Sequence, residues 1–381
     1  METAPAILEL GLVLLAAAGL GVAARRLGLP AVVGYLVLGI AISPFTPGFV
    51  ANREQIQLLA DVGVVLLLFE VGIEVDLASL RREHGGLIWA APLQVVLTTS
   101  IAGGAALLAG VAPVPAAILG LCVALSSSVV IVNITRSRNR TTDPPTEQAL
   151  LGWSVLQDLT GVILAALLLV ALGSSDRPAA VLFAGLLAFV ALALAAAWLL
   201  PRILAQLVDR SDSFLVVSVA SGLVIAGVGA VAFDLPIALA AFVGGIVISE
   251  SPTTVELRRQ LVPFRELLAV LFFVTIGMLL DPHDLVAGLP WLGLFLGLLV
   301  VAKVGVVWIL ARIALPAGRS LQLAVGLGQM GEFSFVLATF LLAADAISGA
   351  VYAALVASVA ISIGLSAVVV RLPRLSAARP T

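Results

Sequence analysis

Residues 29–43 read LPAVVGYLVLGIAIS, and residues 235–249 read LPIALAAFVGGIVIS. Seven of these fifteen positions are identical, and they include a proline, a glycine and a serine as well as aliphatic residues. Gly72 and Asp76 have counterparts in Gly277 and Asp281 at nearly the same spacing. Chance likeness between apolar helices is the alternative interpretation. The pattern favours an internal repeat with a period of about 200 residues.

The whole chain around this repeat is apolar. Of its 381 residues 61% are hydrophobic and only 11% are charged, whereas a soluble domain carries roughly 25% charged residues. A water-soluble protein is therefore excluded, and a net charge of −2 offers no basic face to nucleic acid. Two histidines and a single cysteine, Cys122, predict neither a disulfide nor a His/Cys metal site. We expect no cofactor and no enzymatic activity.

Apolar stretches near membrane length recur from end to end. Because a helix needs about 20 apolar residues to cross a bilayer, we predict an all-α integral membrane protein with about 13 transmembrane helices. The expected spans are 6–24, 30–43, 55–75, 86–110, 114–135, 147–172, 178–200, 213–232, 235–250, 264–280, 289–315, 320–343 and 348–370. Their connections are brief, so we expect a single membrane transport domain and no soluble regulatory domain.

The direction of the repeat predicts the architecture. The repeated stretch belongs to the second and the ninth span, so its two copies cross the membrane in opposite directions. We therefore predict one repeat over about residues 6–172, a linker helix at 178–200 and an inverted second repeat over about 213–370. Secondary transporters are commonly built this way, with the substrate site at the membrane midplane between the repeats.

Arginines give an independent test of this threading. With the N-terminus outside, 17 arginines fall on the inner side and only Arg53 and Arg177 fall on the outer side. The positive-inside rule then predicts an outer N-terminus and a cytoplasmic C-terminus.

Few ionisable residues lie deep in the predicted spans, where each costs roughly 2.5–3.5 kcal/mol. Asp158 lies at the middle of the sixth span, directly after Gln157. A buried salt bridge is one interpretation. The other is a site that binds either a proton or a small cation.

Lys303, the only lysine, lies near the middle of the eleventh span. A buried ammonium needs a carboxylate or helix carbonyls as a partner. Lys303 is therefore interpreted either as a structural tether or as a group that competes with the cation for Asp158.

Two spans carry signs of a broken helix. Gly326, Gly328 and Gly331 surround Gln329 and precede Glu332, and each glycine costs a helix about 1 kcal/mol relative to alanine. The fifth span holds Ser126, Ser127 and Ser128, whose hydroxyls can satisfy freed backbone groups. Close helix packing by small residues is the alternative for the serines. Two breaks in equivalent halves instead predict helix ends that meet at one midplane site.

Other acidic residues are interpreted as lying outside the site. Glu70 and Glu74 share one helix face and are expected to line a solvated funnel, and Asp61 is expected at the membrane interface. The charged stretch from Glu250 to Glu266 is interpreted as an interfacial helix.

At these residues the chain resembles the monovalent cation:proton antiporters, and within them the Kef-like branch of potassium efflux transporters. The resemblance rests on several stretches: 34–39 (GYLVLG), 66–69 with Gly72, 125–128 (LSSS), Gln157-Asp158, Phe272-Phe273 with Gly277-Met278, Lys303, and 328–333 (GQMGEF). It implies the sodium/proton antiporter fold, with a dimerisation domain and a mobile core domain that holds two crossed broken helices. It also implies a homodimer in a bacterial inner (cell) membrane and a role in pH homeostasis.

The resemblance implies that Asp158 is the ion-site acid and Lys303 the core lysine. Gln157 stands where electrogenic sodium exchangers have a second aspartate. We therefore expect an electroneutral antiporter of K⁺ or Na⁺ against protons that works by an elevator-like movement. The cation would bind at Asp158 with help from Gln157, Ser126, Ser127 and Ser128, and Gln329, Gly331 and Glu332 would support the site.

One departure concerns regulation. Kef proteins continue into a cytoplasmic nucleotide-binding domain, whereas this sequence stops at Thr381. Gating by glutathione is therefore not expected, and regulation would fall to a separate cytoplasmic subunit or be absent. The alternatives are a potassium channel-like efflux protein, a non-transporting membrane sensor and an organic-anion symporter on a related fold.

Overall fold

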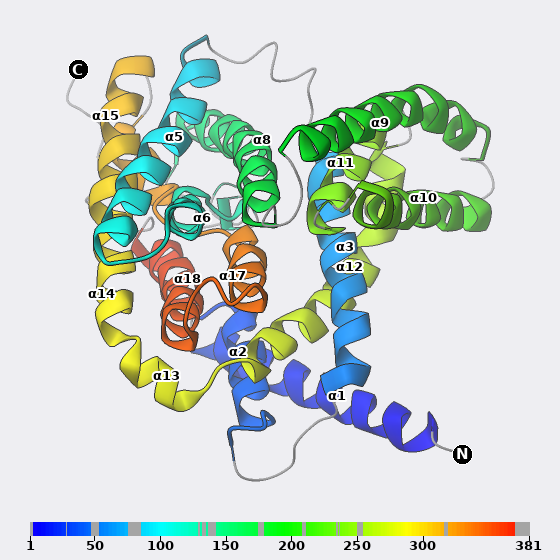
Figure 1. The fold of residues 1–381 in the computed structure, drawn as a ribbon, viewed down its shortest axis with the longest axis horizontal. Helices are drawn as coiled ribbons and strands as arrows, with labels where there is room; N and C mark the ends of the chain where they lie inside the picture. The colour runs from blue at the N-terminus through cyan, green and yellow to red at the C-terminus, as the bar shows by residue number, and fades with distance from the viewer. Residues whose placement is uncertain are drawn as a thin grey trace. The chain divides into compact units, whose positions relative to one another are not determined.

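The computed structural model describes residues 3–27, 29–46, 53–74, 85–128, 130–131, 135, 142–173, 179–207, 211–233, 235, 237–249, 254–315 and 319–369. In these residues the regular structure is helical, as Figure 1 shows. The prediction of an all-α protein is therefore confirmed for this part of the chain.

The helices fall into two compact units, each built from separate parts of the chain. The first unit comprises Met1–Ala24, Ala31–Leu77 and Leu169–Leu279, and the second comprises Arg25–Pro30, Ala78–Leu168 and Leu280–Thr381. The first unit holds α1 (Thr3–Arg26), α2 (Ala31–Ala41), α3 (Arg53–Glu74), α9 (Ala179–Leu207), α10 (Ser211–Phe233), α11 (Ile237–Ser249) and α12 (Thr254–Met278).

The second unit carries the broken helices. It holds α5 (Gly85–Leu108), α6 (Pro113–Ala124), most of α8 (Pro144–Gly173), α13 (Pro282–Ala287), α14 (Leu289–Leu298), the π-helix η1 (Leu299–Val304), α15 (Gly305–Ala314), α16 (Ser320–Gly326), α17 (Phe333–Ala343) and α18 (Gly349–Val369).

The helices agree with the predicted spans. Within the described residues, seven helices are long and apolar enough to cross a membrane, and five shorter apolar helices accompany them. Two predicted boundaries were wrong. α9 runs to Leu207 and does not end at residue 200, and α12 begins at Thr254 and not at residue 264. The charged stretch before residue 264 is therefore part of the same helix as the tenth span.

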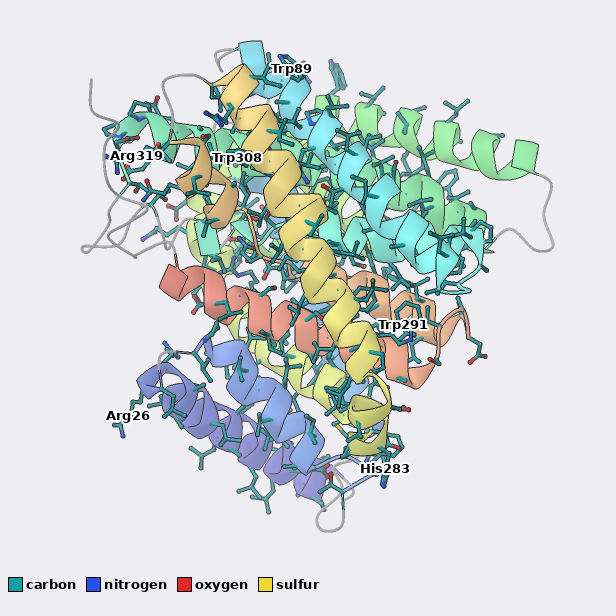
Figure 2. All side chains as sticks on the ribbon, turned by 90° about the vertical axis from the view of Figure 1, so that its left-hand side faces the viewer. Arg26, Trp89, His283, Trp291, Trp308 and Arg319 are labelled. Carbon is teal, nitrogen blue, oxygen red and sulfur yellow. The ribbon has the colours of Figure 1, made fainter. Side chains whose placement is uncertain are left out.

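Two tryptophans lie on either side of Lys303 in the helical segment that carries it. Trp291 lies in α14 and Trp308 in α15, and Figure 2 shows them well separated along the continuous α14–η1–α15 segment. Seventeen residues at about 1.5 Å each give a separation of about 26 Å, which is close to the hydrocarbon thickness of about 30 Å. Since tryptophan favours membrane interfaces, we expect Lys303, which lies between the two rings along the chain, to lie within the membrane span.

Two close helix crossings in the first unit involve the glycines of the repeat. A Cβ built on Gly277 of α12 would lie 2.8 Å from the Cα of Gly39 in α2, and one on Gly245 of α11 would lie 2.8 Å from the Cα of Gly72 in α3. Gly39 corresponds to Gly245 in the repeat, and Gly72 corresponds to Gly277. The same crossing is thus made twice with the partners exchanged, as an inverted repeat would produce.

The expectation of a solvated Glu70 was wrong. Its side chain is 1% exposed, and it forms an ion pair with Arg265 of α12, with Arg258 at 3.6 Å. The buried carboxylate therefore joins α3 to α12 inside the first unit. The side chain of Glu74 lies outside the described residues.

Candidate ion-binding site

Both predicted breaks are present, and they touch each other inside the second unit. The first separates Ala124, the last residue of α6, from the turn at Ser128, and the second separates α16 from α17. The backbone N–H of Gly331 donates to the carbonyl of Leu125 at 2.9 Å. A Cβ on Gly331 would lie 2.7 Å from the carbonyl oxygen of Ser126, so glycine permits this close approach.

Two glutamine side chains satisfy the backbone groups that the first break sets free. The Gln157 Oε1 accepts from the N–H of Ser126 at 2.9 Å, and the Gln329 Oε1 accepts from the N–H of Ser127 at 2.7 Å. The Gln157 Nε2 also donates to the carbonyl of Ala124 at 3.0 Å. Because unpaired backbone groups are costly at membrane depth, these bonds stabilise the non-helical segment. Both ends of the Gln157 amide are thus hydrogen-bonded to the backbone of the first break.

The three serines have different partners. The Ser126 Oγ donates to the carbonyl of Leu327 in the second break at 2.8 Å. The Ser127 Oγ accepts from the N–H of Val130 at 3.4 Å, at the start of the next turn. Only the Ser128 Oγ donates to Asp158, at 3.1 Å from Oδ2. Two of the serines therefore hold the breaks, and one contacts the carboxylate.

Asp158 is nearly fully buried, with 5% of its surface exposed. Its Oδ1 has no hydrogen-bond partner among the residues that the structure describes. The Lys303 ammonium and the Glu332 carboxylate both lie near enough to interact electrostatically with Asp158. A buried carboxylate oxygen without a protein partner is a group that a proton or a cation can satisfy.

Ser154 is a candidate site residue that sequence reasoning missed. It precedes Asp158 by four residues on α8, so the two side chains share one face of the helix. Its hydroxyl is buried and, like Asp158 Oδ1, has no hydrogen-bond partner in the described part of the chain. The i, i+4 spacing was a signal in the sequence. It was not distinctive, because serines are scattered through the apolar spans.

Lys303 binds both breaks at once. It is fully buried in η1, and its Nζ donates to the carbonyl of Leu125 at 2.6 Å and to the carbonyl of Gln329 at 2.5 Å. One carbonyl comes from each break, so these contacts match the interpretation of Lys303 as a tether.

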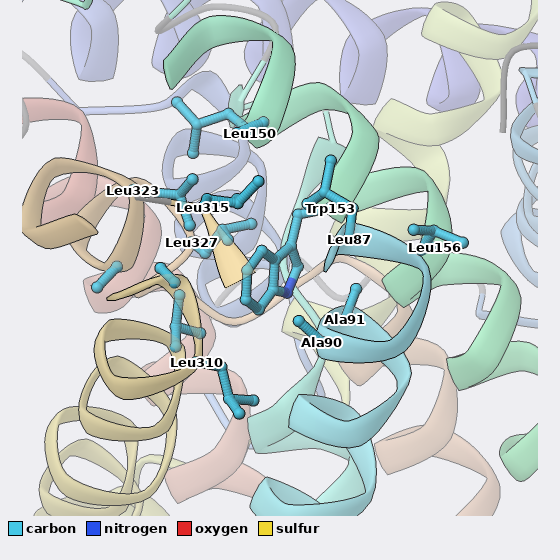
Figure 3. Packing of buried hydrophobic residues seen from close by; sticks show 14 of the residues in the cluster. Leu87, Ala90, Ala91, Leu150, Trp153, Leu156, Leu310, Leu315, Leu323 and Leu327 are labelled. Carbon is cyan, nitrogen blue, oxygen red and sulfur yellow. The ribbon is translucent and has the colours of Figure 1, made fainter. Parts of the chain in front are cut away.

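A tightly packed cluster holds α8 in place beside the site. The ring of Trp153 is fully buried against Leu87, Ala90 and Ala91 of α5, with Leu310, Leu323 and Leu327 in the same cluster (Figure 3). Trp153 lies one residue before Ser154. The packing of its ring therefore fixes the register of the helix that carries Ser154 and Asp158.

The second unit thus brings together the predicted site residues: Asp158, Gln157, Ser126, Ser127, Ser128, Lys303, Gln329, Gly331 and Glu332. Among the described residues, no group of three or more His, Cys, Asp or Glu side chains could hold a metal ion.

Comparison with known proteins agrees with this geometry. The sequence model of a family described as "Sodium/hydrogen exchanger, transmembrane" matches residues 11–372. A structure of the sodium proton antiporter MjNhaP1 from Methanocaldococcus jannaschii at pH 8 is similar to this chain, with a TM-score of 0.71 and 18% identity over 97% of this chain and 100% of the other. An electron-microscopy map of the same antiporter gives a TM-score of 0.69 and 16% identity over 100% of both chains.

Proposed function

This chain belongs to the sodium/hydrogen exchanger family, and from that premise we propose that it exchanges K⁺ or Na⁺ for protons at Asp158. As a member it is a multi-pass membrane transporter, a cation:proton antiporter and not an enzyme. Its fold is the antiporter fold of MjNhaP1.

One observation supports the site most strongly. The Oδ1 of buried Asp158 and the hydroxyl of Ser154 have no hydrogen-bond partners among the described residues, and they lie one helical turn apart. A dehydrated cation needs several oxygen ligands in place of its water shell. We assign this role to the Asp158 carboxylate with the hydroxyls of Ser154 and Ser128. The two breaks around this cation site are stabilised by Gln157, Ser126, Ser127 and Gln329.

The proposed cycle follows from competition at one carboxylate. Asp158 releases its proton on one side of the membrane and takes a cation, and on the other side it reverses the exchange. The second unit carries the protonated or cation-loaded site across by an elevator-like movement. An empty, charged carboxylate crosses poorly because its charge would enter the hydrocarbon, so exchange is obligatory.

Because Asp158 is the one carboxylate that we assign to exchange its proton for a cation, we propose one cation per proton and electroneutral exchange. A net charge would gain about 2.3 kcal/mol for each 100 mV of membrane potential, whereas electroneutral exchange ignores voltage. In this cycle the Lys303 ammonium tethers the two breaks through the carbonyls of Leu125 and Gln329 and opposes cation binding at Asp158.

The wider setting is part of the same proposal. The arginine distribution supports an outer N-terminus and a cytoplasmic C-terminus. K⁺ and Na⁺ are both candidate cations. The proposal places the protein in a bacterial inner membrane as a homodimer. A separate cytoplasmic subunit would supply regulation where it exists.

We expect Ser154→Ala to raise the apparent KM for the cation about fivefold. The variant removes one hydroxyl ligand, and such a contact contributes about 1 kcal/mol. Folding should be unaffected, because the hydroxyl has no protein partner in the described residues. Titration of exchange with cation concentration measures the effect, and an unchanged KM would remove Ser154 from the ligand set.

The function itself is tested in proteoliposomes with a trapped pH dye, pulsed first with K⁺ and then with Na⁺. Cation pulses should move protons, and the ratio of the two responses identifies the preferred cation. Clamping the membrane potential at different values should leave the rate unchanged. A current that is driven by a cation gradient without proton movement would contradict the exchanger and show that the protein is a channel.

A further inference from the structure

Two polar side chains of α5 are buried near the site, although the proposed cycle does not use them. Gln94 and Thr98 are both 0% exposed. They stand four residues apart and share one face of the helix. Buried polar groups at membrane depth are expensive unless they are paired, so their partners indicate why they are there.

Thr98 holds the backbone next to Lys303. Its Oγ1 donates to the carbonyl of Ala302 at 2.9 Å, inside η1. A π-helical turn is rare and is found mostly at functional sites, because it changes the direction of the side chains that it carries. The turn gives Lys303 the direction that reaches the carbonyls of Leu125 and Gln329. Thr98 is therefore hydrogen-bonded to the π-helical turn that orients the Lys303 side chain.

Gln94 joins this turn to the rest of the site. Its Nε2 donates to Thr98 Oγ1 at 3.2 Å and to the carbonyl of Ala124 at 3.3 Å. Its Oε1 accepts from Gln157 Nε2 at 2.6 Å and from Trp153 Nε1 at 3.3 Å. One buried side chain thus bonds the end of α6, the α8 residue next to Asp158, and the threonine that holds η1.

We propose that Thr98, backed by Gln94, is a positioning residue that keeps η1 in its π-helical form and so holds the Lys303 ammonium at the two breaks. Thr98 thereby sets how strongly this fixed positive charge opposes a cation at Asp158. The proposal rests on the proposed function, because its effect appears in cation binding during exchange.

Thr98→Val tests the proposal. Valine keeps the shape of threonine but cannot donate to the carbonyl of Ala302, so the turn can relax and Lys303 can move away from the site. The apparent KM for the cation should fall about threefold or more. At an effective dielectric constant of about 20, moving one unit charge away by a few ångströms weakens its repulsion of another enough to change binding by about this factor. Thr98→Ser, which keeps the hydroxyl, should retain the wild-type KM.

Thr99→Val is the matched control. It makes the same chemical change at the next residue of α5, where the threonine Oγ1 is buried but has no hydrogen-bond partner in the described residues. This variant should keep the wild-type KM. A smaller yield of folded protein lowers Vmax without moving KM, so the KM separates positioning from a general loss of structure.

A Thr98→Val protein with the wild-type KM and only a reduced Vmax would overturn the proposal. If the Thr98→Val protein does not fold, Thr98→Ala takes its place, because it removes the same hydroxyl and puts no methyl group there. The same comparison of KM and Vmax then decides. These results are distinct from a failure of the proposed function, in which the wild-type protein itself would exchange no cation for protons.

Discussion

Asp158→Asn should reduce cation-driven proton movement to the level of protein-free liposomes. Asparagine has the shape of aspartate and can still accept from Ser128, but it neither ionises nor carries a proton for exchange. Because one carboxylate is proposed to bind both substrates, the loss should be complete for K⁺ and Na⁺ alike. The measurement is the dye response of proteoliposomes that contain equal amounts of folded wild-type and variant protein.

Asp61→Asn is the control for this change. It makes the same substitution in α3 of the first unit, where Asp61 is exposed, and it should leave exchange intact. Exchange that persists in Asp158→Asn at near the wild-type rate would show that another group carries the proton.

Arg265→Leu should lower the free energy of unfolding by about 3 kcal/mol. Removing one partner of a buried ion pair costs about 3–5 kcal/mol, since it leaves an uncompensated charge. Here the charge left behind is Glu70, which is 1% exposed. Arg258 at 3.6 Å compensates in part, so we expect the lower end of the range. Unfolding of the purified protein in detergent measures the change.

The double variant Glu70→Gln with Arg265→Leu should recover most of the lost stability, because it removes the unpaired charge. Arg259→Leu on the same helix is the control. Arg259 is exposed and pairs with Glu256 at the surface, and such pairs contribute little, so its unfolding should follow the wild type. An Arg265→Leu protein as stable as the Arg259→Leu protein would contradict the account of this ion pair.

Much of the fold was predictable because helix length and apolar composition report directly on membrane spans. The breaks could also be predicted, since three glycines around Gln329 and three adjacent serines weaken a helix wherever they occur. The start of α12 was missed because charged residues such as Arg258 and Arg259 suggested a surface helix. In the structure the same helix continues into the apolar part of the span.

Long-range partners could not be predicted. Because Glu70 shares a helix face with Glu74, the sequence pattern indicates a solvated funnel. Its partner Arg265 is distant in the sequence, and only the packing of α3 on α12 brings the two together. The π-helical turn at Lys303 has no glycine or proline that would have indicated it. Gln94 and Thr98 resemble many isolated polar residues of apolar spans, and their role depends on contacts with three other helices.

The most direct test of the central claim is the proton released when the cation binds. Purified protein in weakly buffered detergent solution, titrated with K⁺ or Na⁺ near its working pH, should release up to one proton for each cation bound. The Asp158→Asn protein should release none. Cation binding without proton release by the wild-type protein, or equal release by the variant, would contradict alternate binding of the two substrates at Asp158.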